Sequence, residues 1–345
     1  MKILRKILFP FSLIYHLVTS IRNYLFDKNI LKVAEFDVPT IVVGNLSVGG
    51  TGKTPQIEFL IRLLSSEYKV AVLSRGYKRE GKGFLLANEK SSAKLIGDEP
   101  YQYYKKFENI LVAVDVNRVN GINKLLKLNP RPEVILLDDA YQHRKVKGGL
   151  NILLTSYDNL YVDDLILPAG NLRESSSGAR RADVIVVTKC PNDLAKDVKN
   201  NIFHKIKPGI NQEVYFSTIE YDSELKGSDV ISIDDLKDYE ILLVTGIANP
   251  NPLIEHLEAL KLNFKHLEYP DHHKFSKQEL EEIKNLFDEI ESNKKIILTT
   301  EKDYVRIFDE FEKLYYISIK TAFLEDEIII KNSINRYVGK GSRYS

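Results

Sequence analysis

After Pro39 the chain alternates short hydrophobic runs with longer segments in which hydrophobic residues recur every three to four positions. The runs, rich in β-branched and aliphatic residues, predict buried strands at 40–44, 69–74, 110–114, 133–139 and 150–155. The longer segments predict amphipathic helices at 55–67, 99–107 and 117–128. Strands that alternate with helices in this way predict an α/β fold, in which helices cover both faces of a parallel sheet.

A second series of hydrophobic runs predicts strands near 182–189, 213–221, 239–250, 294–303 and 313–320. These strands predict a second, smaller α/β domain. The stretch before them, 167–182, has the Pro, Gly and Ser content of a connection. We therefore expect an N-terminal helix in 1–35, a first α/β domain in 36–150 and a second in 151–345. The pattern leaves open a return of the C-terminal part to the first domain.

The first 32 residues differ in charge from the rest of the chain. They hold six Lys or Arg residues against the single Asp27, whereas the whole chain has a net charge of +1. Hydrophobic residues recur there at helical spacing, at Ile7, Phe11, Ile14, Val18, Ile21 and Leu25. A basic, amphipathic helix that bears aromatic residues is suited to lie in an anionic membrane surface.

Other interpretations of this segment stay open. A core helix of the first domain would bury the same hydrophobic face. A membrane span is disfavoured, because the uncharged run 7–21 would reach roughly 22 Å as a helix against a hydrocarbon core of roughly 30 Å. A signal peptide is disfavoured because no small-x-small cleavage site follows.

Length and composition narrow the class of protein. A chain of 345 residues has room for two domains, and its 43% of hydrophobic residues supplies their cores. The near-zero net charge gives no general attraction to nucleic acid, so we expect no such partner. The one cysteine, Cys190, excludes an internal disulfide framework and fits a reducing compartment. A monomer is favoured.

A glycine-rich loop follows the strand at 40–44 and leads into the helix that starts near Lys53. It matches a phosphate-binding loop, except that Ser47 stands where the first glycine is usual. Its glycines let successive N–H groups face one anion, and the helix dipole adds to the attraction. Lys53 should reach the β- and γ-phosphates of ATP, and the Thr54 hydroxyl should bind Mg²⁺. The expected nucleotide-binding residues are Ser47, Val48, Gly49, Gly50, Thr51, Gly52, Lys53 and Thr54.

An acidic pair supports this interpretation. Asp138 and Asp139 end the hydrophobic run 133–139, at the sheet edge where Mg²⁺ on Thr54 needs a further protein ligand. The alternative is a solvated acidic pair at a strand end. Ser47 is compatible with the loop, because a small residue with negative φ fits there. The sequence therefore predicts a site for ATP and Mg²⁺.

The chain resembles the tetraacyldisaccharide 4'-kinases, the lipid A 4'-kinase family, over nearly its whole length. The loop itself, VGNLSVGGTGKTP, is similar to that family's version, in which the early glycine is ordinarily absent. The other matching motifs are SRGY (74–77), GDEP (97–100), DDAYQHR (138–144), LPAGNLRE (167–174), TGIANP (245–250), YPDHH (269–273) and TTEKD (299–303). Ala140 departs from a common glycine, and Asn171 from a usual proline or similar residue.

The resemblance implies transfer of the ATP γ-phosphate to the 4'-hydroxyl of tetraacyldisaccharide 1-phosphate, which forms lipid IVA in lipid A biosynthesis. It implies a peripheral, monotopic location at the cytoplasmic face of the inner membrane of a Gram-negative bacterium. The acylated acceptor stays in the bilayer, so the resemblance also accounts for a helix that lies on an anionic membrane.

Roles for single residues also come from the resemblance. Asp98 looks like the general base and His272 like the partner that orients it and holds the proton. The alternative for Asp98 is a helix N-cap. The expected catalytic residues are Asp98, His272, Asp139, Lys53 and Arg173. The expected substrate-binding residues are Arg75, Tyr77, Arg118, Gln142, His143 and Glu174, and Lys302 is a further candidate for charge neutralisation. Arginine suits bidentate binding of phosphate, although each of these charges can equally be a solvated surface group.

Three rival interpretations are disfavoured. Zinc binding by 271–273 is unexpected, because adjacent residues of an extended chain point to opposite faces. A membrane-cycling ATPase switch with a deviant loop would carry Lys at the position of Val48. A GTPase would carry an Asn-Lys-x-Asp element, but the run at 186–190 has Thr188 in place of the Asn and is followed by Pro191 in place of the Asp. Without that carboxylate guanine loses its acceptor, so adenine is favoured.

Overall fold

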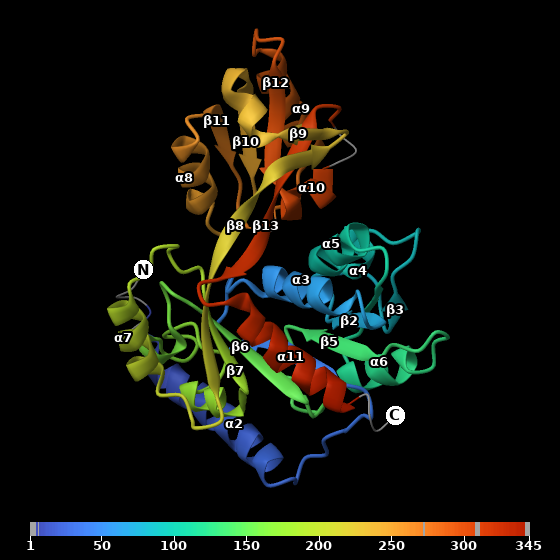
Figure 1. The fold of residues 1–345 in the computed structure, drawn as a ribbon, viewed down its shortest axis with the longest axis vertical. Helices are drawn as coiled ribbons and strands as arrows, with labels where there is room; N and C mark the ends of the chain where they lie inside the picture. The colour runs from blue at the N-terminus through green and yellow to red at the C-terminus, as the bar shows by residue number, and fades with distance from the viewer. Residues whose placement is uncertain (1–4, 6, 272, 308–310, 342–345) are drawn as a thin grey trace.

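The computed structural model describes residues 5, 7–271, 273–307 and 311–341. Two bodies lie one above the other, and a pair of long strands joins them (Figure 1). The strands are β1 (Thr40–Asn45), β2 (Val70–Ser74), β3 (Leu85–Leu86), β4 (Leu111–Val114), β5 (Val134–Asp138), β6 (Leu150–Ser156), β7 (Val184–Thr188), β8 (Glu213–Gly227), β9 (Val230–Ser232), β10 (Glu240–Thr245), β11 (Asn263–Glu268), β12 (Lys295–Thr300) and β13 (Leu314–Phe323).

The helices alternate with these strands along most of the chain. They are α2 (Phe9–Asp27), α3 (Lys53–Leu64), α4 (Ala93–Ile96), α5 (Asp98–Lys106), α6 (Arg118–Leu125), α7 (Lys196–Ile206), α8 (Asn251–Ala259), α9 (Lys277–Asp288), α10 (Glu301–Ile307) and α11 (Glu327–Gly341). Short 3₁₀ helices are η1 (Tyr161–Asp163), η2 (Ser176–Arg181) and η3 (Ile233–Asp238).

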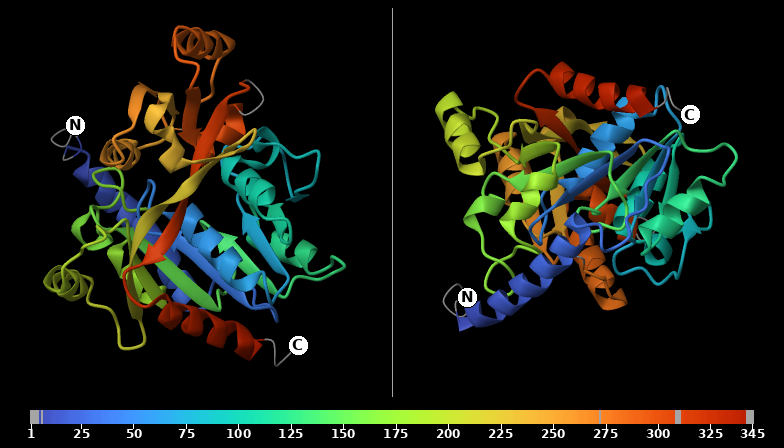
Figure 2. Two further views of the ribbon diagram at one scale, coloured as in Figure 1. Left: turned by 45° about the horizontal axis from the view of Figure 1, so that its top comes forward. Right: turned by 90° about the horizontal axis from the view of Figure 1, so that it is seen from below.

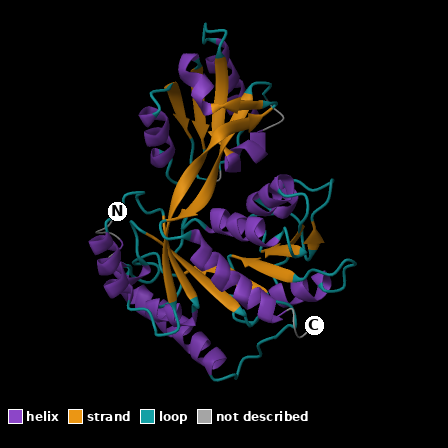
Figure 3. Ribbon diagram, viewed as in Figure 1, coloured by secondary structure: helices purple, strands orange, loops and turns teal. Residues whose placement is uncertain are grey.

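The sheet of the first body has the strand order β8-β7-β6-β1-β5-β2-β4-β3. Its strands are parallel apart from the short β3 at the edge. Side chains of β1 alternate between two cores, because successive residues of a strand point to opposite faces. Ile41 and Val43 pack with helices α3 and α11, and Val42 packs with α6 and α7 on the other face. The expected parallel sheet with helices on both faces is confirmed (Figure 3).

The second body has its own parallel strands in the order β11-β10-β12-β13. Strand β8 belongs to both sheets: its start pairs with β7, and its remainder runs antiparallel to β13. The β8–β13 ladder extends from the Ser217–Phe323 pair to the Gly227–Tyr315 pair. These two strands are therefore the physical connection between the bodies.

The boundary expected at residue 150 cuts the first sheet. Strands β6 and β7 and the start of β8 extend that sheet, because each pairs in parallel with its neighbour. Helix α11 also lies on it, with Ile330, Ile334 and Val338 fully buried against α3 and the strands. We propose that the first body comprises residues up to about 217 together with those after about 323, and that the second body comprises the residues between.

A buried ion triad joins the bodies at their interface. The ammonium of Lys106, on α5, lies 2.7 Å from Glu58 Oε2 of α3 and 2.7 Å from Glu301 Oε2 of α10. The side chains of the two glutamates are only 2% and 9% exposed. Burial, and then the negative charge of Glu58, raise the pKa of Glu301. One lysine therefore pairs with two carboxylates that belong to different bodies, and Arg62 Nη1 lies 3.3 Å from Glu58 as a second cation.

Helix α2 lies on the outside of the first body, on the side opposite α11 (Figure 2). Only Ser12 and Phe26 of this helix are buried. Exposed hydrophobic side chains line its free flank: Phe9, Phe11, Leu13, Ile14, Leu17, Val18, Ile21 and Tyr24. The alternative of a core helix is therefore wrong. No helix among the described residues is long and apolar enough to cross a membrane.

Candidate active site

The glycine-rich loop lies between the end of β1 and the start of α3. Gly49 and Gly52 have φ values of 107° and 78°, in the left-handed region that favours glycine, and Gly52 is the N-cap of α3. Ser47 and Val48 are not among the described residues with positive φ. They extend instead along a neighbouring segment: Ser47 forms a bridge with Leu172, and the Val48 N–H donates to the Asn171 carbonyl at 2.8 Å. This pairing explains why the first glycine is not needed.

Two side chains from neighbouring strands fix the middle of the loop at Thr51. Asn45 Nδ2 donates to the Thr51 hydroxyl at 2.8 Å, and the Thr188 hydroxyl donates to the Thr51 carbonyl at 3.0 Å. Asn45 ends β1 and Thr188 ends β7, so the carboxyl ends of two parallel strands hold the loop. A loop held in this way keeps its N–H groups ready for an anion.

The two aspartates at the end of β5 have opposite electrostatic surroundings. Asp138 is 5% exposed and accepts from the Ser74 hydroxyl at 3.1 Å. Burial, and then the charge of Asp139, raise the pKa of Asp138 to about 6. Burial also acts to raise the pKa of Asp139, but Lys53 and Arg173 outweigh it and hold that pKa below its usual value.

Asp139 stands where the loop and the acidic pair meet. Its backbone is left-handed, with φ 46°, and its Oδ1 lies 3.8 Å from Lys53 Nζ and 2.9 Å from Arg173 Nη1. Thr54 follows Lys53 on α3, at the same end of the sheet. A hydroxyl and two carboxylates are the hard oxygen ligands that Mg²⁺ prefers. The mutual repulsion that raises the pKa of Asp138 is what a divalent cation would relieve, so these residues fit Mg²⁺.

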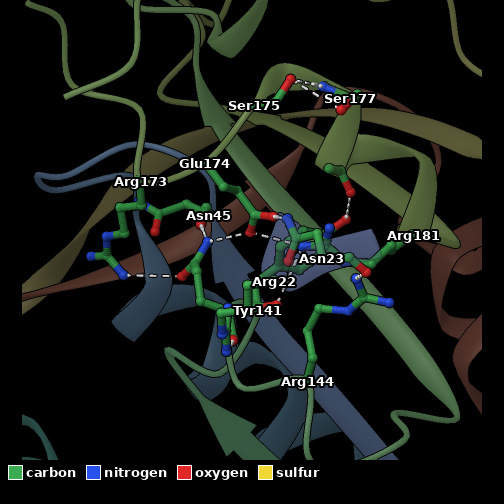
Figure 4. A network of polar contacts seen from close by, with 12 residues as sticks. Arg22, Asn23, Asn45, Tyr141, Arg144, Arg173, Glu174, Ser175, Ser177 and Arg181 are labelled. Carbon is green, nitrogen blue, oxygen red and sulfur yellow. Dashed lines mark hydrogen bonds and ion pairs between the residues drawn. The ribbon is translucent and has the colours of Figure 1, made fainter. Parts of the chain in front are cut away.

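Glu174 is the centre of a polar network next to Arg173 (Figure 4). Its side chain is 4% exposed and accepts from Arg181 Nη2 at 2.8 Å and from Gln142 Nε2 at 3.1 Å. Gln142 Nε2 also donates to the Asn45 carbonyl at 2.8 Å, and Arg173 Nη1 lies 3.4 Å from Gln142 Oε1. The network ties the end of β1 to the segment that carries Arg173.

Helix α2 is bound to these same site residues. Asn23 Nδ2 donates to Glu174 Oε2 at 2.7 Å, and the Tyr15 hydroxyl donates to the Arg173 carbonyl at 3.0 Å. Arg22 donates to the Gln142 carbonyl at 2.9 Å. The polar edge of α2 thus contacts the candidate site, while Ile14 and Val18 are exposed on its other side.

Asp98 is the first residue of α5, and its carboxylate reaches the second body. Its Oδ2 accepts from Arg306 of α10 at 2.6 Å and 3.2 Å. Arg306 also donates to Oδ1 of Asp303, a carboxylate with no exposed area, at 2.8 Å. The N-cap of α5 is Gly97, and no side chain caps this helix, so the N-cap alternative for Asp98 is wrong. His272, its expected partner, lies outside the described residues.

The other sequence candidates lie in different surroundings. Arg75 and Tyr77 are exposed after β2, whereas Arg118 is 2% exposed and donates to the carbonyls of Asp115 and Asp138. A solvated surface charge is therefore the wrong alternative for Arg118. Burial, and then Arg118, lower the pKa of His143 to about 4.

Lys302 lies between the two bodies. Its ammonium is 3.2 Å from Asp271 and 4.0 Å from Glu99 of α5. Among the residues that the structure describes, no group of three or more His, Cys, Asp or Glu side chains could hold a metal ion. Asp271 and His273 therefore belong to no such group.

A glycine loop between a parallel strand and a helix, with a lysine opposite an acidic strand end, defines the class of P-loop nucleotide-binding proteins. Comparison with known proteins narrows the class. Residues 4–337 match the model of the tetraacyldisaccharide-1-P 4'-kinase family. The chain therefore belongs to this family and is a kinase, as the sequence motifs indicated. The match favours the kinase over the ATPase and GTPase interpretations.

Individual relatives agree with the family match. The chain is 55% identical to the tetraacyldisaccharide 4'-kinase of Flavobacterium johnsoniae over 98% of each chain. It is 38% identical to that of Porphyromonas gingivalis over 94% of each. The crystal structure of LpxK from Aquifex aeolicus in complex with ATP superposes with a TM-score of 0.78 at 34% identity, covering 97% of this chain and 99% of that one.

Sequence reasoning missed several residues of the site. Asn45 lies in the loop motif and Thr188 in the run 186–190, but neither pattern predicts that these side chains hold the loop. Arg306 lies three residues after Asp303, so a helix beginning at the TTEKD motif would place both on one face. Arg181 lies in the segment interpreted only as a connection. Helical spacing was the available signal for Arg306, and no sequence signal pairs Arg181 with Glu174.

Proposed function

We propose that this kinase transfers the γ-phosphate of ATP to the 4'-hydroxyl of tetraacyldisaccharide 1-phosphate while it lies on an anionic membrane surface. One observation carries the proposal: Lys53 of the loop and Arg173 of the segment bound to α2 converge on the same carboxylate, Asp139. Two residues, Asp139 and Arg173, thereby connect Lys53 of the loop to Tyr15 of helix α2. Family membership and the ATP complex of the Aquifex relative support the donor and the acceptor.

The loop residues 47–54 bind the phosphates of ATP through backbone N–H groups. Lys53 leaves Asp139 to neutralise the β- and γ-phosphates, and the Thr54 hydroxyl with the carboxylates of Asp138 and Asp139 would hold Mg²⁺. When bound, Mg²⁺ supplies positive charge that stabilises the phosphates in transfer. Arg173 is the second cation at this point and suits bidentate contact with the γ-phosphate.

Asp98 acts as the general base, with His272 as its partner. The 4'-oxygen forms a bond to the γ-phosphorus, the bond from that phosphorus to the β–γ bridging oxygen breaks, and the hydroxyl proton passes to the Asp98 carboxylate. Arg306 holds that carboxylate from the second body at 2.6 Å, so the relative position of the two bodies sets the position of the base. His272 then takes up the proton and restores Asp98.

The acceptor binds beside α2, next to the site residues that this helix contacts. Gln142 and Glu174 orient the sugar hydroxyls through the network around Asn23. Arg75 and Tyr77 are exposed after β2 and contact the acceptor, as does His143, and Arg118 supports the backbone at Asp138.

The exposed flank of α2 holds the enzyme at the bilayer. Ile14 and Val18 are 62% and 60% exposed on this flank, whereas the polar edge is fixed to the body by Ser12, whose hydroxyl donates to the Ile166 carbonyl and accepts from the Ala169 N–H. Apolar side chains entering the acyl boundary and basic side chains facing the headgroups favour an anionic membrane. The enzyme is therefore peripheral to the inner membrane, on its cytoplasmic face, where ATP is present.

Vesicle assays test the proposal. Purified enzyme should phosphorylate tetraacyldisaccharide 1-phosphate in phosphatidylglycerol-containing vesicles and hydrolyse little ATP without it. Ile14→Glu should reduce co-flotation with these vesicles and activity on vesicle-bound acceptor, while activity on detergent-dispersed acceptor is kept. Ile210→Glu, at a fully exposed isoleucine outside α2, is the matched control. Rapid ATP hydrolysis without acceptor would overturn the kinase assignment, and equal flotation of both variants would overturn the membrane role of α2.

A further inference from the structure

Lys189 is a half-buried cation beside the phosphate loop, and the kinase chemistry described above does not use it. It follows β7 directly, in the run 186–190 that resembles a guanine-reading element only loosely. Its backbone is left-handed, with φ 58°. Lysine rarely adopts this conformation, because the Cβ then approaches the carbonyl oxygen. The neighbouring Thr188 hydroxyl is bound to the loop at Thr51, so the turn is held against the loop.

The side chain of Lys189 reaches the glycine loop. A Cβ placed on Gly50 would lie 3.9 Å from Lys189 Nζ. Within residues 5, 7–271, 273–307 and 311–341, this ammonium has no hydrogen bond or ion pair. Burial lowers the pKa of Lys189. Asp158 acts in the opposite direction, and the positive charge of Lys53 lowers the pKa further. Two lysine ammonium groups thus lie near the same loop, and only Lys53 has a carboxylate partner.

We propose that Lys189 is a further nucleotide-binding residue, whose ammonium neutralises phosphate charge of the bound nucleotide from the β7 side of the loop. A polyanion in the loop would meet Lys53 on one side and Lys189 on the other, and its charge would relieve their repulsion. The proposal rests on the loop being the ATP site. Lysine suits this position as a compact point charge on a flexible stem.

The contact predicts a particular binding pattern. Lys189→Gln should weaken ATP and ADP by about 10-fold each, the effect of one lost hydrogen bond to a charged group. Adenosine, which lacks phosphates, should bind equally well to both proteins. The KM for ATP should rise while kcat stays close to that of the parent, because the contact is the same before and during transfer. Lys189→Arg should keep most of the affinity.

Lys207→Gln is the matched control. Lys207 is also a left-handed lysine, with φ 48°, but it is exposed. It is the C-cap of α7, which leads from the carboxyl end of β7 back to the amino ends of the parallel strands, away from the loop. It should bind all three ligands as the parent does. A general effect of replacing a left-handed lysine would change both variants, and would also lower their melting temperatures together.

Titration calorimetry with ATP, ADP and adenosine decides between the outcomes. Unchanged ATP affinity in Lys189→Gln overturns the proposal, and so does an equal loss for adenosine, which would place Lys189 against the base. Lys53→Ala is measured in parallel. If Lys53→Ala abolishes ATP binding while Lys189→Gln does not weaken it, the loop site stands and only the role of Lys189 fails. If neither change affects ATP, the loop is not the nucleotide site.

Discussion

Replacing Lys106 by methionine removes the one cation between Glu58 and Glu301. Methionine keeps most of the hydrophobic stem, so the change isolates the charge. The two carboxylates would then face each other across the interface between the bodies, where both side chains are almost fully buried. Glu58 keeps a second cation, because Arg62 Nη1 lies 3.3 Å from its Oε2. The Glu301 carboxyl is therefore the one that takes up a proton.

The geometry sets the magnitude. Lys106 Nζ lies 2.7 Å from an oxygen of each glutamate, and the three side chains are 16%, 2% and 9% exposed. Removing one partner from a buried ion pair costs about 3–5 kcal/mol. At about 2 cal/mol/K of unfolding entropy per residue, a loss of this size in a chain of 345 residues lowers the melting temperature by about 4–7 °C.

The loss should depend on pH with a definite sign. The pKa of Glu301 is already raised by burial and by Glu58, and losing Lys106 raises it further. An acid whose pKa is raised in the folded state binds more protons there than when unfolded, so stability falls as pH rises above the unfolded value. Lys106→Met should therefore be less destabilising at pH 5.5 than at pH 8.

Circular dichroism melting at the two pH values measures the effect, since the chain has no tryptophan. Lys105→Met, at the exposed lysine next in sequence, is the matched control. Adding Glu301→Gln to Lys106→Met should recover part of the loss by removing one of the two charges. Equal melting temperatures for Lys105→Met and Lys106→Met at pH 8, or a loss that does not shrink toward pH 5.5, would show that the triad does not stabilise the interface.

Three further predictions concern the site. Lys53→Ala and Asp139→Ala should each remove nearly all kinase activity with the circular dichroism spectrum unchanged; normal turnover of either would mean that the phosphate site lies elsewhere. Asp98→Ala and His272→Ala should each lower kcat by roughly 10²–10⁴-fold, and the double variant should be little worse than the poorer single one; additive losses would contradict the dyad. Because burial lowers the pKa of His143 to about 4, the neutral ring stabilises the fold above pH 6.5 and this contribution is lost toward pH 4; His143→Gln should flatten that part of the stability profile, and an unchanged profile would show that His143 titrates normally.

Local patterns allowed much of the fold to be predicted. Each hydrophobic run of the first body became a strand within one or two residues of its expected limits, because a strand buried on both faces needs continuous apolar residues. The loop was recognised although Ser47 replaces a glycine, since Gly49 and Gly52 supply the left-handed turns. The amphipathic face of α2 was also visible, because the spacing of Ile14 and Val18 needs no knowledge of the rest of the fold.

Contacts between distant segments were not predictable in the same way. The sequence leaves open a return of the C-terminal part to the first domain, but nothing near Ile334 specifies that α11 packs on the first sheet. The same limit applies to Arg306 and Asp98, which are 208 positions apart. The domain limit near 150 was placed from the positions of the motifs. The first sheet extends beyond that limit, because β6 pairs with β7.

The position of α11 has a consequence for the order in which the protein is made. Its residues Ile330, Ile334 and Val338 close the core beside α3, yet they leave the ribosome after every residue of the second body. Domains generally fold as units during synthesis. Here the second body can complete its core on the ribosome first. One face of the sheet of the first body stays uncovered until α11 has left the ribosome.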